Sequence, residues 1–307
     1  MGRIAFLFPG QGSQYIGMGQ ELVNNFIEAE QIMNDANDIL AMDLKTLLFS
    51  GPENELNNTQ NTQPAIFTVS YIINKILNSK DIYPKMLAGH SLGEYSALAA
   101  ASVFSFEEGI KLVRQRGIIM NQAIPNGQGA MAAVIGLDDE KLLSICQQVD
   151  GICEIANYNS PGQLVISGEK EAVYEAGQLA EQSAAKKIVK LDVSGPFHSS
   201  LMKVAEEQFS DLINKVELRS PKYPIVANVT ADFVEKPAKI KELLIRQLSG
   251  SVRWVESINL MISNGIDTFI EVGPGRVLKG LMRRIDRSVN AYNVEDLKSL
   301  DKLLNKL

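Results

Sequence analysis

The sequence has little of what metal centres, disulfide frameworks and membrane spans are built from. Among 307 residues there are two histidines and two cysteines, and Cys146 and Cys153 lack the paired spacing of a zinc site or a disulfide framework. We expect both cysteines to pack in a reducing cytoplasm. No apolar run reaches the about 18 residues of a membrane-spanning helix, and the apolar stretch at residues 4–8 ends too early for a signal peptide. A soluble, cytoplasmic protein with no metal centre is expected.

Charge and composition narrow the class further. The formal net charge of -6 argues against a nucleic acid as the partner, because a polyanion requires a basic surface. With 45% hydrophobic and 21% charged residues, the chain has the composition of a globular protein and can bury a large core. We expect one large domain and a smaller one.

Short apolar segments at residues 4–8, 86–88, 225–227 and 268–272 are separated by segments with helical spacing. This alternation predicts an α/β core, with a mostly parallel sheet covered by helices on both faces. The polar, asparagine-rich run at residues 54–63 is expected to be a surface loop.

The pattern changes between residues 125 and 194. Strand patterns at 130–135, 153–156, 163–167 and 187–193 alternate with helical patterns at 138–149 and 169–185. This β-α-β-β-α-β order predicts a ferredoxin-like α+β subdomain, inserted into the core. Turn residues mark its start at 125–129 and its end at 194–196. We therefore divide the chain into a core of residues 1–124 and 195–307 and a small subdomain of residues 125–194.

The clearest motif is Gly89-His90-Ser91-Leu92-Gly93, a G-x-S-x-G pattern between a short strand and a helical run at residues 94–101. This context is typical of a nucleophile elbow, in which small flanking residues let the chain turn sharply and expose the serine hydroxyl. The turn also places Ser91 at a helix N-terminus, where backbone N–H groups and the helix dipole favour an oxyanion. The alternative is a glycine-rich turn in which Ser91 only caps the helix. The strand-turn-helix context favours the nucleophile.

A serine nucleophile needs a base, and histidine is the commonest base near neutral pH. His90 adjoins Ser91, so at a sharp elbow its side chain is expected to point away and pack beneath the turn. His198 is the remaining histidine and lies in a loop-like stretch directly after the small subdomain. A single histidine is more often structural than catalytic, but elimination favours His198 as the base.

The glycines of Gly10-Gln11-Gly12-Ser13-Gln14 follow the first strand, but Tyr15 stands where a dinucleotide fingerprint needs its third glycine. The turn could instead aim the N–H of Gln11 at an oxyanion, together with the N–H of Leu92. A plain strand-to-helix turn remains equally compatible with the sequence.

Two arginines, Arg114 and Arg116, lie on the helix predicted at residues 106–123. They are roughly 200° apart around the helix axis, so only one can face a given site. Both flank the apolar stripe at similar angles, and periodicity does not choose between them. A surface salt bridge is the alternative for each.

These motifs resemble those of the malonyl-CoA:acyl carrier protein transacylases of bacterial fatty acid synthesis along nearly the whole chain. The resemblance implies a hydrolase-like core with a ferredoxin-like subdomain and an active site in the cleft between them. The motifs, in chain order, are Phe8-Pro9-Gly10-Gln11-Gly12-Ser13-Gln14, Gly89-His90-Ser91-Leu92-Gly93-Glu94, Arg116-Gly117, Gly195-Pro196-Phe197-His198 and Glu271-Val272-Gly273-Pro274-Gly275.

The resemblance also implies roles for individual residues. Ser91 is then the nucleophile and His198 the base, and the N–H groups of Gln11 and Leu92 form the oxyanion hole. Arg116 binds the malonyl carboxylate. Further along the chain, Gln247 orients the histidine through its backbone carbonyl, so no triad carboxylate is needed. Phe197 is typical of malonyl-selective members of the family.

The activity implied is transfer of malonyl from malonyl-CoA to the phosphopantetheine thiol of acyl carrier protein, through a malonyl-serine and without a metal or redox cofactor. A titration near about pH 6–7 is expected, as for an ordinary histidine. Carrier proteins of this family are typically acidic, and a helical segment would place four cations within roughly 60° on one face as a docking stripe. These cations are Arg276, Lys279, Arg283 and Arg287. A solvated face is the alternative, and a monomer is expected.

Three other functions fit parts of the pattern less well. An esterase or thioesterase would share the elbow, but an arginine for the acyl carboxylate favours transfer. A patatin-like lipase would need an Asp-Gly-Gly or Asp-Gly-Ala motif, and Asp150-Gly151 is followed by Ile152. A silent acyl-binding or scaffold protein would not need the catalytic residues, which are all present.

Overall fold

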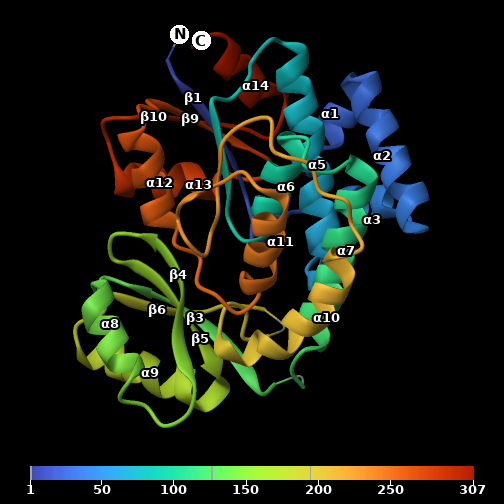
Figure 1. The fold of residues 1–307 in the computed structure, drawn as a ribbon. Helices are drawn as coiled ribbons and strands as arrows, with labels where there is room; N and C mark the ends of the chain where they lie inside the picture. Colours follow the sequence, from blue (N-terminus) through green and yellow to red (C-terminus); the bar gives the residue numbers. More distant parts are fainter. Residues whose placement is uncertain (1, 126, 194) are drawn as a thin grey trace.

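The computed structural model describes residues 2–125, 127–193 and 195–307, and it has two parts, a large α/β core and a small sheet with two helices (Figure 1). Met1 lies outside the described residues, as do Asn126 and Ser194 at the predicted start and end of the small subdomain. The architecture confirms the predicted fold class, a mostly parallel α/β core with a separate small antiparallel sheet.

The core is built on a six-stranded sheet in the order β10-β9-β1-β2-β7-β8. All neighbouring strands are parallel except β7 and β8, which form an antiparallel pair. The four predicted strands are confirmed, whereas β8 and β10 lack a clear apolar run and were not predicted. The strands are β1 (Ile4–Phe8), β2 (Met86–Gly89), β7 (Ile225–Val226), β8 (Phe233–Val234), β9 (Thr268–Val272) and β10 (Asn290–Val294).

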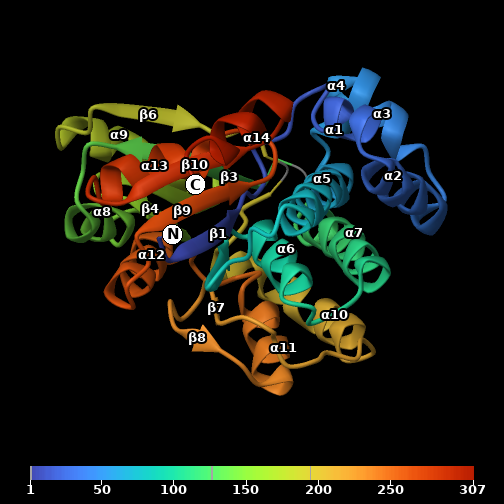
Figure 2. The same ribbon diagram turned by 90° about the horizontal axis from the view of Figure 1, so that it is seen from above.

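Helices cover both faces of this sheet, as predicted. Along β1, Phe6 and Phe8 pack into one apolar cluster, while Ala5 and Leu7 pack into another, because successive side chains of a strand point to opposite faces. Figure 2 shows α5, α6 and α7 on one side of β1 and α12 and α13 on the other. The core helices are α1 (Gln20–Asn25), α2 (Ile27–Leu40), α3 (Leu44–Ser50), α4 (Glu53–Leu56), α5 (Thr59–Ser79), α6 (Leu92–Ala100), α7 (Phe106–Gln122), α10 (Lys203–Ile213), α11 (Pro237–Arg246), α12 (Trp254–Ser263), α13 (Val277–Ile285) and α14 (Leu297–Leu304), with a 3-10 turn at Ser200–Met202.

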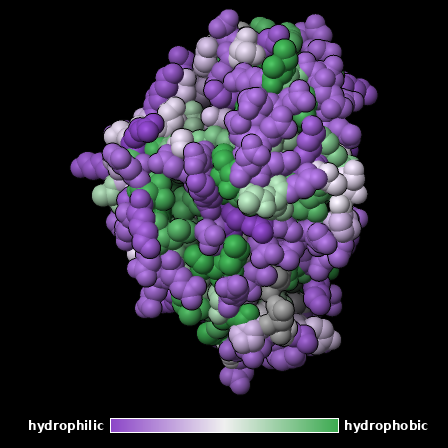
Figure 3. All heavy atoms as spheres, turned by 90° about the vertical axis from the view of Figure 1, so that its right-hand side faces the viewer, coloured by the Kyte–Doolittle hydropathy of each residue, from purple (hydrophilic) through white to green (hydrophobic). Residues whose placement is uncertain are grey.

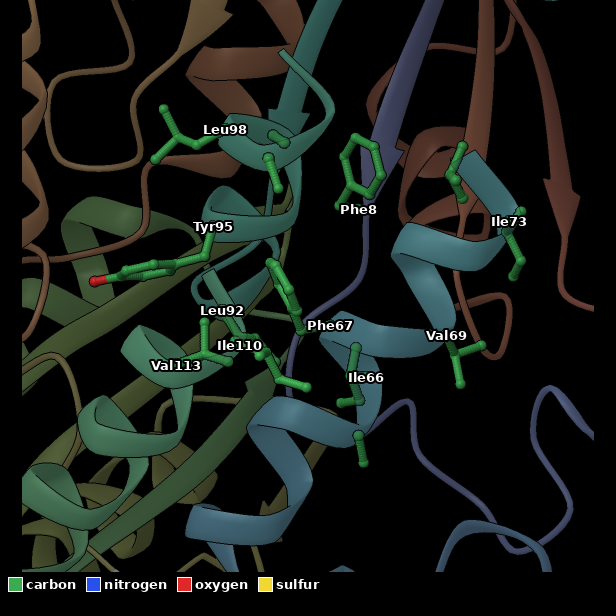
Figure 4. Packing of buried hydrophobic residues seen from close by; sticks show 14 of the residues in the cluster. Phe8, Ile66, Phe67, Val69, Ile73, Leu92, Tyr95, Leu98, Ile110 and Val113 are labelled. Atoms are coloured by element: carbon green, nitrogen blue, oxygen red, sulfur yellow. The ribbon is translucent and has the colours of Figure 1, made fainter. Parts of the chain in front are cut away.

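The packing of α5, α6 and α7 brings the helix that carries the two arginines close to the elbow. Phe67 of α5 lies between Phe8 and Ile110 in the buried cluster (Figure 4). A Cβ atom at Gly117 of α7 would lie 2.8 Å from the Cα of Gln60, so only glycine allows α5 and α7 to approach this closely.

The outer face seen in Figure 3 is mostly hydrophilic, with hydrophobic residues in smaller patches.

The small part contains a four-stranded antiparallel sheet in the order β4-β5-β3-β6. Its chain order is β-α-β-β-α-β, which confirms the predicted ferredoxin-like arrangement (Figure 1). The thiols of Cys146 and Cys153 are buried in it, with 3.7 Å between their sulfur atoms. Its elements are β3 (Gly129–Ile135), α8 (Asp139–Cys146), β4 (Cys153–Ser160), β5 (Gln163–Glu169), α9 (Lys170–Gln182) and β6 (Lys187–Lys190).

The prediction of a surface loop at residues 54–63 is wrong. The segment forms α4 and the first turn of α5, and Asn61, Thr62 and Gln63 are buried. Their polar groups are satisfied inside the protein, since the Asn61 amide donates to the Glu55 carbonyl and the Thr62 hydroxyl to the Leu56 carbonyl. Composition alone does not distinguish such an inward-facing polar run from a solvated loop.

Within residues 2–125, 127–193 and 195–307, no helix is both long and apolar enough to cross a membrane. The same described residues contain no cluster of three or more histidine, cysteine, aspartate or glutamate side chains arranged to hold a metal ion.

Candidate active site

Ser91 lies at a strained turn between β2 and α6. Its backbone has φ 51° and ψ -107°, a conformation that side chains other than glycine rarely adopt and that is typical of a nucleophile elbow. A Cβ atom at Gly89 would lie 1.9 Å from the Gly93 backbone, and one at Gly93 would lie 2.0 Å from the Phe8 carbonyl oxygen. The two glycines therefore allow the turn to close against itself and against β1.

His198 lies within hydrogen-bond distance of the serine hydroxyl. Its Nε2 lies 2.8 Å from the Ser91 hydroxyl oxygen, and its Nδ1 lies 2.8 Å and 3.1 Å from the carbonyl oxygens of Gln247 and Gly250. Carbonyl oxygens only accept, so Nδ1 carries the proton and Nε2 accepts from the serine. Two backbone carbonyls occupy the place of the aspartate in a Ser-His-Asp triad.

The environment of His198 favours the neutral imidazole. Burial, followed by the nearby charge of Arg116, lowers the pKa of His198 to about 3, although the two carbonyl acceptors oppose this shift. This lowered pKa differs from the expectation of an ordinary titration near about pH 6–7. A neutral histidine is the form that can take a proton from Ser91.

Arg116 is fully buried beside the serine hydroxyl. Its Nη2 donates to the Ser91 oxygen at 3.3 Å and to Gln247 Oε1 at 3.0 Å, and its Nη1 donates to Gln63 Oε1 at 2.9 Å. The guanidinium also lies over the ring of Tyr95, 5.1 Å from its centroid. A cation is thus fixed within hydrogen-bond distance of the serine.

Arg114 points to a different place. Its Nη1 donates to the carbonyl of Gln60 at 2.7 Å and to the Asn61 side chain, both on α5. Of the two arginines that helical periodicity left open, the structure brings Arg116 to Ser91 and uses Arg114 to connect α7 to α5.

Gln11 and Leu92 lie with Ser91 and His198 around one hollow of about 330 Å³. Leu92 is the first residue of α6, and Gln11 follows the carboxyl end of β1. Met131 of β3 and Asn157 of β4 line the same hollow, and so does Phe197. The site therefore lies in a cleft between the large and small sheets, where the family resemblance places it.

His90, the other histidine, does not pair with the serine. Its Nε2 lies 2.7 Å from Asn159 Oδ1 on β4, and its ring is 5.4 Å from the ring of Trp254. This agrees with the expectation that its side chain points away from Ser91.

Three residues that the sequence interpretation did not select support the site. Gln63 binds Arg116, and Asn228 holds the elbow by accepting from the Ser91 N–H at 2.7 Å and donating to the Gly89 carbonyl at 2.7 Å. Glu94 accepts from Gln247 and from the Asn228 N–H. Asn228 follows β7, and a polar residue at the carboxyl end of a parallel strand was a signal available in the sequence.

The predicted docking stripe is only partly helical. Helix α13 spans Val277–Ile285, so Lys279 and Arg283 are one turn apart on it, but Arg276 precedes it and Arg287 follows its end. The assumption that one helical face carries all four cations is therefore wrong. Arg276 and Lys279 instead line a hollow of about 620 Å³ with three lysines of the C-terminal segment, Lys298, Lys302 and Lys306.

Comparisons with known proteins agree with this architecture and site. Residues 5–303 match the family model of the acyl transferase domain. The malonyl CoA-acyl carrier protein transacylase of Bacillus subtilis (strain 168) is 44% identical, with all of this chain and 98% of the relative covered. That of Staphylococcus aureus (strain MRSA252) is 45% identical, with 98% of each chain covered.

Solved structures are similar over the same extent. An acyl carrier protein S-malonyltransferase from Vibrio cholerae has a TM-score of 0.95 at 42% identity, covering 98% of this chain and 99% of that chain. A malonyl-transacylase in complex with a type II PKS acyl-carrier protein has a TM-score of 0.97 at 42% identity, covering 99% of this chain and 100% of that chain. The chain therefore belongs to the acyl transferase family and, within it, to the malonyl CoA-acyl carrier protein transacylases.

Proposed function

We propose that the chain transfers the malonyl group of malonyl-CoA to the phosphopantetheine thiol of acyl carrier protein through a malonyl-Ser91 intermediate, and so supplies fatty acid chain elongation. One observation carries the proposal: the Ser91 oxygen lies 2.8 Å from His198 Nε2 and 3.3 Å from Arg116 Nη2. A nucleophile, its base and a cation for an acyl carboxylate thus meet in one cleft.

The first half of the reaction acylates the serine. His198 Nε2 takes the Ser91 proton while the serine oxygen attacks the thioester carbonyl, which gives a tetrahedral intermediate. We propose that the backbone N–H groups of Gln11 and Leu92 donate to its oxyanion, because both residues border the cleft and Leu92 begins a helix. The C–S bond then breaks, and the coenzyme A thiol leaves with the proton from His198.

The second half runs the same chemistry in reverse. The carrier thiol gives its proton to His198 and attacks the malonyl-serine ester, and the serine oxygen leaves with that proton. The transfer requires no metal or redox cofactor. Gln247 holds the imidazole in one tautomer through its carbonyl in both halves, because His198 Nδ1 lies 2.8 Å from that oxygen.

The function is tested by incubating the protein with radiolabelled malonyl-CoA, with and without phosphopantetheinylated acyl carrier protein. The proposal expects covalent label on the enzyme without the carrier and label on the carrier when it is present. Release of free malonate without carrier dependence would instead indicate a thioesterase, and binding without covalent label would indicate an acyl-binding protein.

Arg116 is expected to determine selectivity for malonyl. A carboxylate that enters the cleft loses water, and a buried guanidinium replaces it. Replacing Arg116 with Ala should weaken malonyl transfer by about 1.5–3 kcal/mol, or about ten- to a hundredfold or more. Transfer from acetyl-CoA, which lacks the carboxylate, should fall less or rise. The measurement is kcat/KM for each acyl-CoA.

Arg114→Ala is the matched control, since Arg114 lies on the same helix but binds α5. It should leave the malonyl-to-acetyl preference unchanged. If Arg114→Ala alters that preference and Arg116→Ala does not, the assignment of the carboxylate-binding arginine is wrong.

For the carrier, we propose that cations at and around α13 contact its acidic surface: exposed Arg276 and partly buried Lys279 in the hollow, and exposed Arg283 and Arg287 outside it. Reversing Arg283 and Arg287 to Glu should raise the apparent KM for carrier protein and leave serine acylation by malonyl-CoA nearly unchanged. Steady-state kinetics at low salt measure this.

The control reverses two exposed lysines at α11, Lys236 and Lys239, by the same charge. Equal effects of both reversals would mean that only the net charge matters. Unchanged carrier kinetics in the α13 variant would remove Arg283 and Arg287 from the docking surface.

The division into residues 1–124 and 195–307 for the core and 125–194 for the small subdomain is our proposal for the extent of the two parts. The monomeric state and the cytoplasmic location stay predictions.

A further inference from the structure

A buried carboxylate lies directly behind the proposed active site, and the reaction described above gives it no role. Glu94, in the first turn of α6, is 2% exposed. Its Oε2 accepts from the side-chain amide of Gln247 at 2.6 Å and from the backbone N–H of Asn228 at 3.1 Å. These partners belong to other segments, so the carboxylate connects α6 to them rather than capping its own helix.

The bond to Gln247 fixes which way the Gln247 amide faces. An ionised carboxylate only accepts, so the NH₂ end of the amide must point to Glu94, where it also donates to the Ser91 carbonyl at 3.0 Å. The Oε1 end therefore points to Arg116 and accepts from its Nη2 at 3.0 Å. With the amide turned around, two donors would face each other at Arg116.

This arrangement leaves the positive charge of Arg116 available to bind an acyl carboxylate. The guanidinium is held by two neutral amide oxygens, those of Gln63 and Gln247, and its Nε is buried with no hydrogen-bond partner among the described residues. A carboxylate bound directly to the guanidinium would compete with an acyl carboxylate. Glu94 instead binds Gln247, which in turn binds Arg116. It therefore orients the Gln247 amide without pairing with the guanidinium itself.

The second bond of Glu94 reaches the elbow. Asn228, whose N–H it accepts, binds the Ser91 N–H through Oδ1 and the Gly89 carbonyl through Nδ2. These two bonds hold the turn at Gly89 and at the strained residue Ser91, on either side of His90. One carboxylate thus connects the segment that holds the nucleophile to the amide that holds the arginine.

We propose that Glu94 is a positioning residue that orients the Gln247 amide toward Arg116 and holds Asn228 against the elbow, and so sets the preference for a carboxylate-bearing acyl group. The proposal rests on the roles proposed above for Ser91 and Arg116. Burial raises the pKa of Glu94 to about 7, so assays at about pH 8 keep the carboxylate ionised.

The test compares three variants by their rates of serine acylation from malonyl-CoA and from acetyl-CoA. The rates are measured by quenched flow, with the intact mass of the protein as the readout. Glu94→Met keeps the side-chain volume but removes the hydrogen-bond acceptor. It should slow malonylation at least about tenfold, which is the size expected for a lost hydrogen bond to a charged group, and it should slow acetylation less. Glu94→Asp keeps the charge but is one methylene shorter, and it should show the same change in preference to a smaller extent. Glu94→Gln keeps an acceptor of the same reach and should keep the parent's preference for malonyl over acetyl.

Glu271→Met is the matched control, because Glu271 is also a buried glutamate and accepts from two backbone N–H groups, those of Leu278 and Lys279. It should lower the melting temperature but leave the malonyl-to-acetyl ratio unchanged. If Glu94→Met does not fold, the contrast between Glu94→Asp and Glu94→Gln decides the same question.

An unchanged ratio in Glu94→Met and Glu94→Asp, or in Glu94→Asp alone if Glu94→Met does not fold, would overturn the positioning role. Equal loss in Glu94→Gln and Glu94→Asp would overturn it too, since an acceptor of the same reach as Glu94 would then fail to preserve the preference. Failure of the parent to acquire malonyl on Ser91 would instead overturn the proposed function, so the two failures are distinguishable.

Discussion

Replacing Ser91 with Ala is expected to abolish the covalent malonyl adduct while malonyl-CoA still binds. The adduct needs an oxygen at the elbow, and in the described part of the chain it is the Ser91 hydroxyl that lies 2.8 Å from His198 Nε2. Binding should persist, because the proposed oxyanion donors are backbone groups and Arg116 is unchanged. Intact-mass measurement after mixing with malonyl-CoA should show one malonyl group on the parent and none on the variant, and peptide mapping should place the group on Ser91.

Ser96→Ala is a matched control on the same helix. Ser96 is buried, and its hydroxyl has no hydrogen-bond partner among the described residues, so its loss should leave the adduct in place. A malonyl group that persists in Ser91→Ala, or that maps to Cys146 or Cys153, would overturn the proposed mechanism.

The sequence predicted the elements that are locally determined. The apolar run of β1 and the glycines around Ser91 act through backbone geometry and burial over a few residues, and the structure has both at the predicted positions. The ferredoxin-like order was also readable, because its strands and helices differ in periodicity. By contrast, β10 at the sheet edge contains two asparagines and lacks the strand pattern.

The part of the site that the sequence did not predict depends on contacts between distant segments. Gln63 looked like part of a polar loop, and only the packing of α5 against α7 brings it to Arg116. Helical periodicity could not choose between Arg114 and Arg116, since both lie at similar angles to the apolar stripe; the family resemblance implied Arg116, and the packing of α7 against α5 shows the physical difference between the two. The strongly lowered pKa of His198 also needs the fold, because burial and Arg116 cause it.

The burial of His198 and the burial of Glu94 have opposite effects on how the stability of the fold changes with pH. The pKa of His198 is lowered, so the unfolded chain takes up a proton below about pH 6.5 that the folded chain does not, and this contribution destabilises the fold as the pH falls toward about 3. The pKa of Glu94 is raised to about 7, so the folded chain holds a proton there that the unfolded chain releases above about pH 4.5. Lowering the pH from about 7 to about 4.5 therefore stabilises the fold through Glu94.

Replacing His198 with Ala is expected to slow serine acylation by about 10²–10⁴-fold, the range for loss of a general base. In the parent, the acid limb of kcat/KM should lie well below the ordinary histidine pKa of about 6.5, because burial and Arg116 hold the imidazole neutral. Rates are measured after rapid pH jumps, so that unfolding in acid does not contribute.

Arg116→Gln supplies the control for the pH profile. It removes the cation that lowers the pKa of His198, so the acid limb should move to higher pH, toward the ordinary histidine value. Arg114→Gln, which leaves Arg116 in place, should not move the limb. A parent limb at the ordinary histidine pKa that stays there in Arg116→Gln would contradict the lowered pKa of His198.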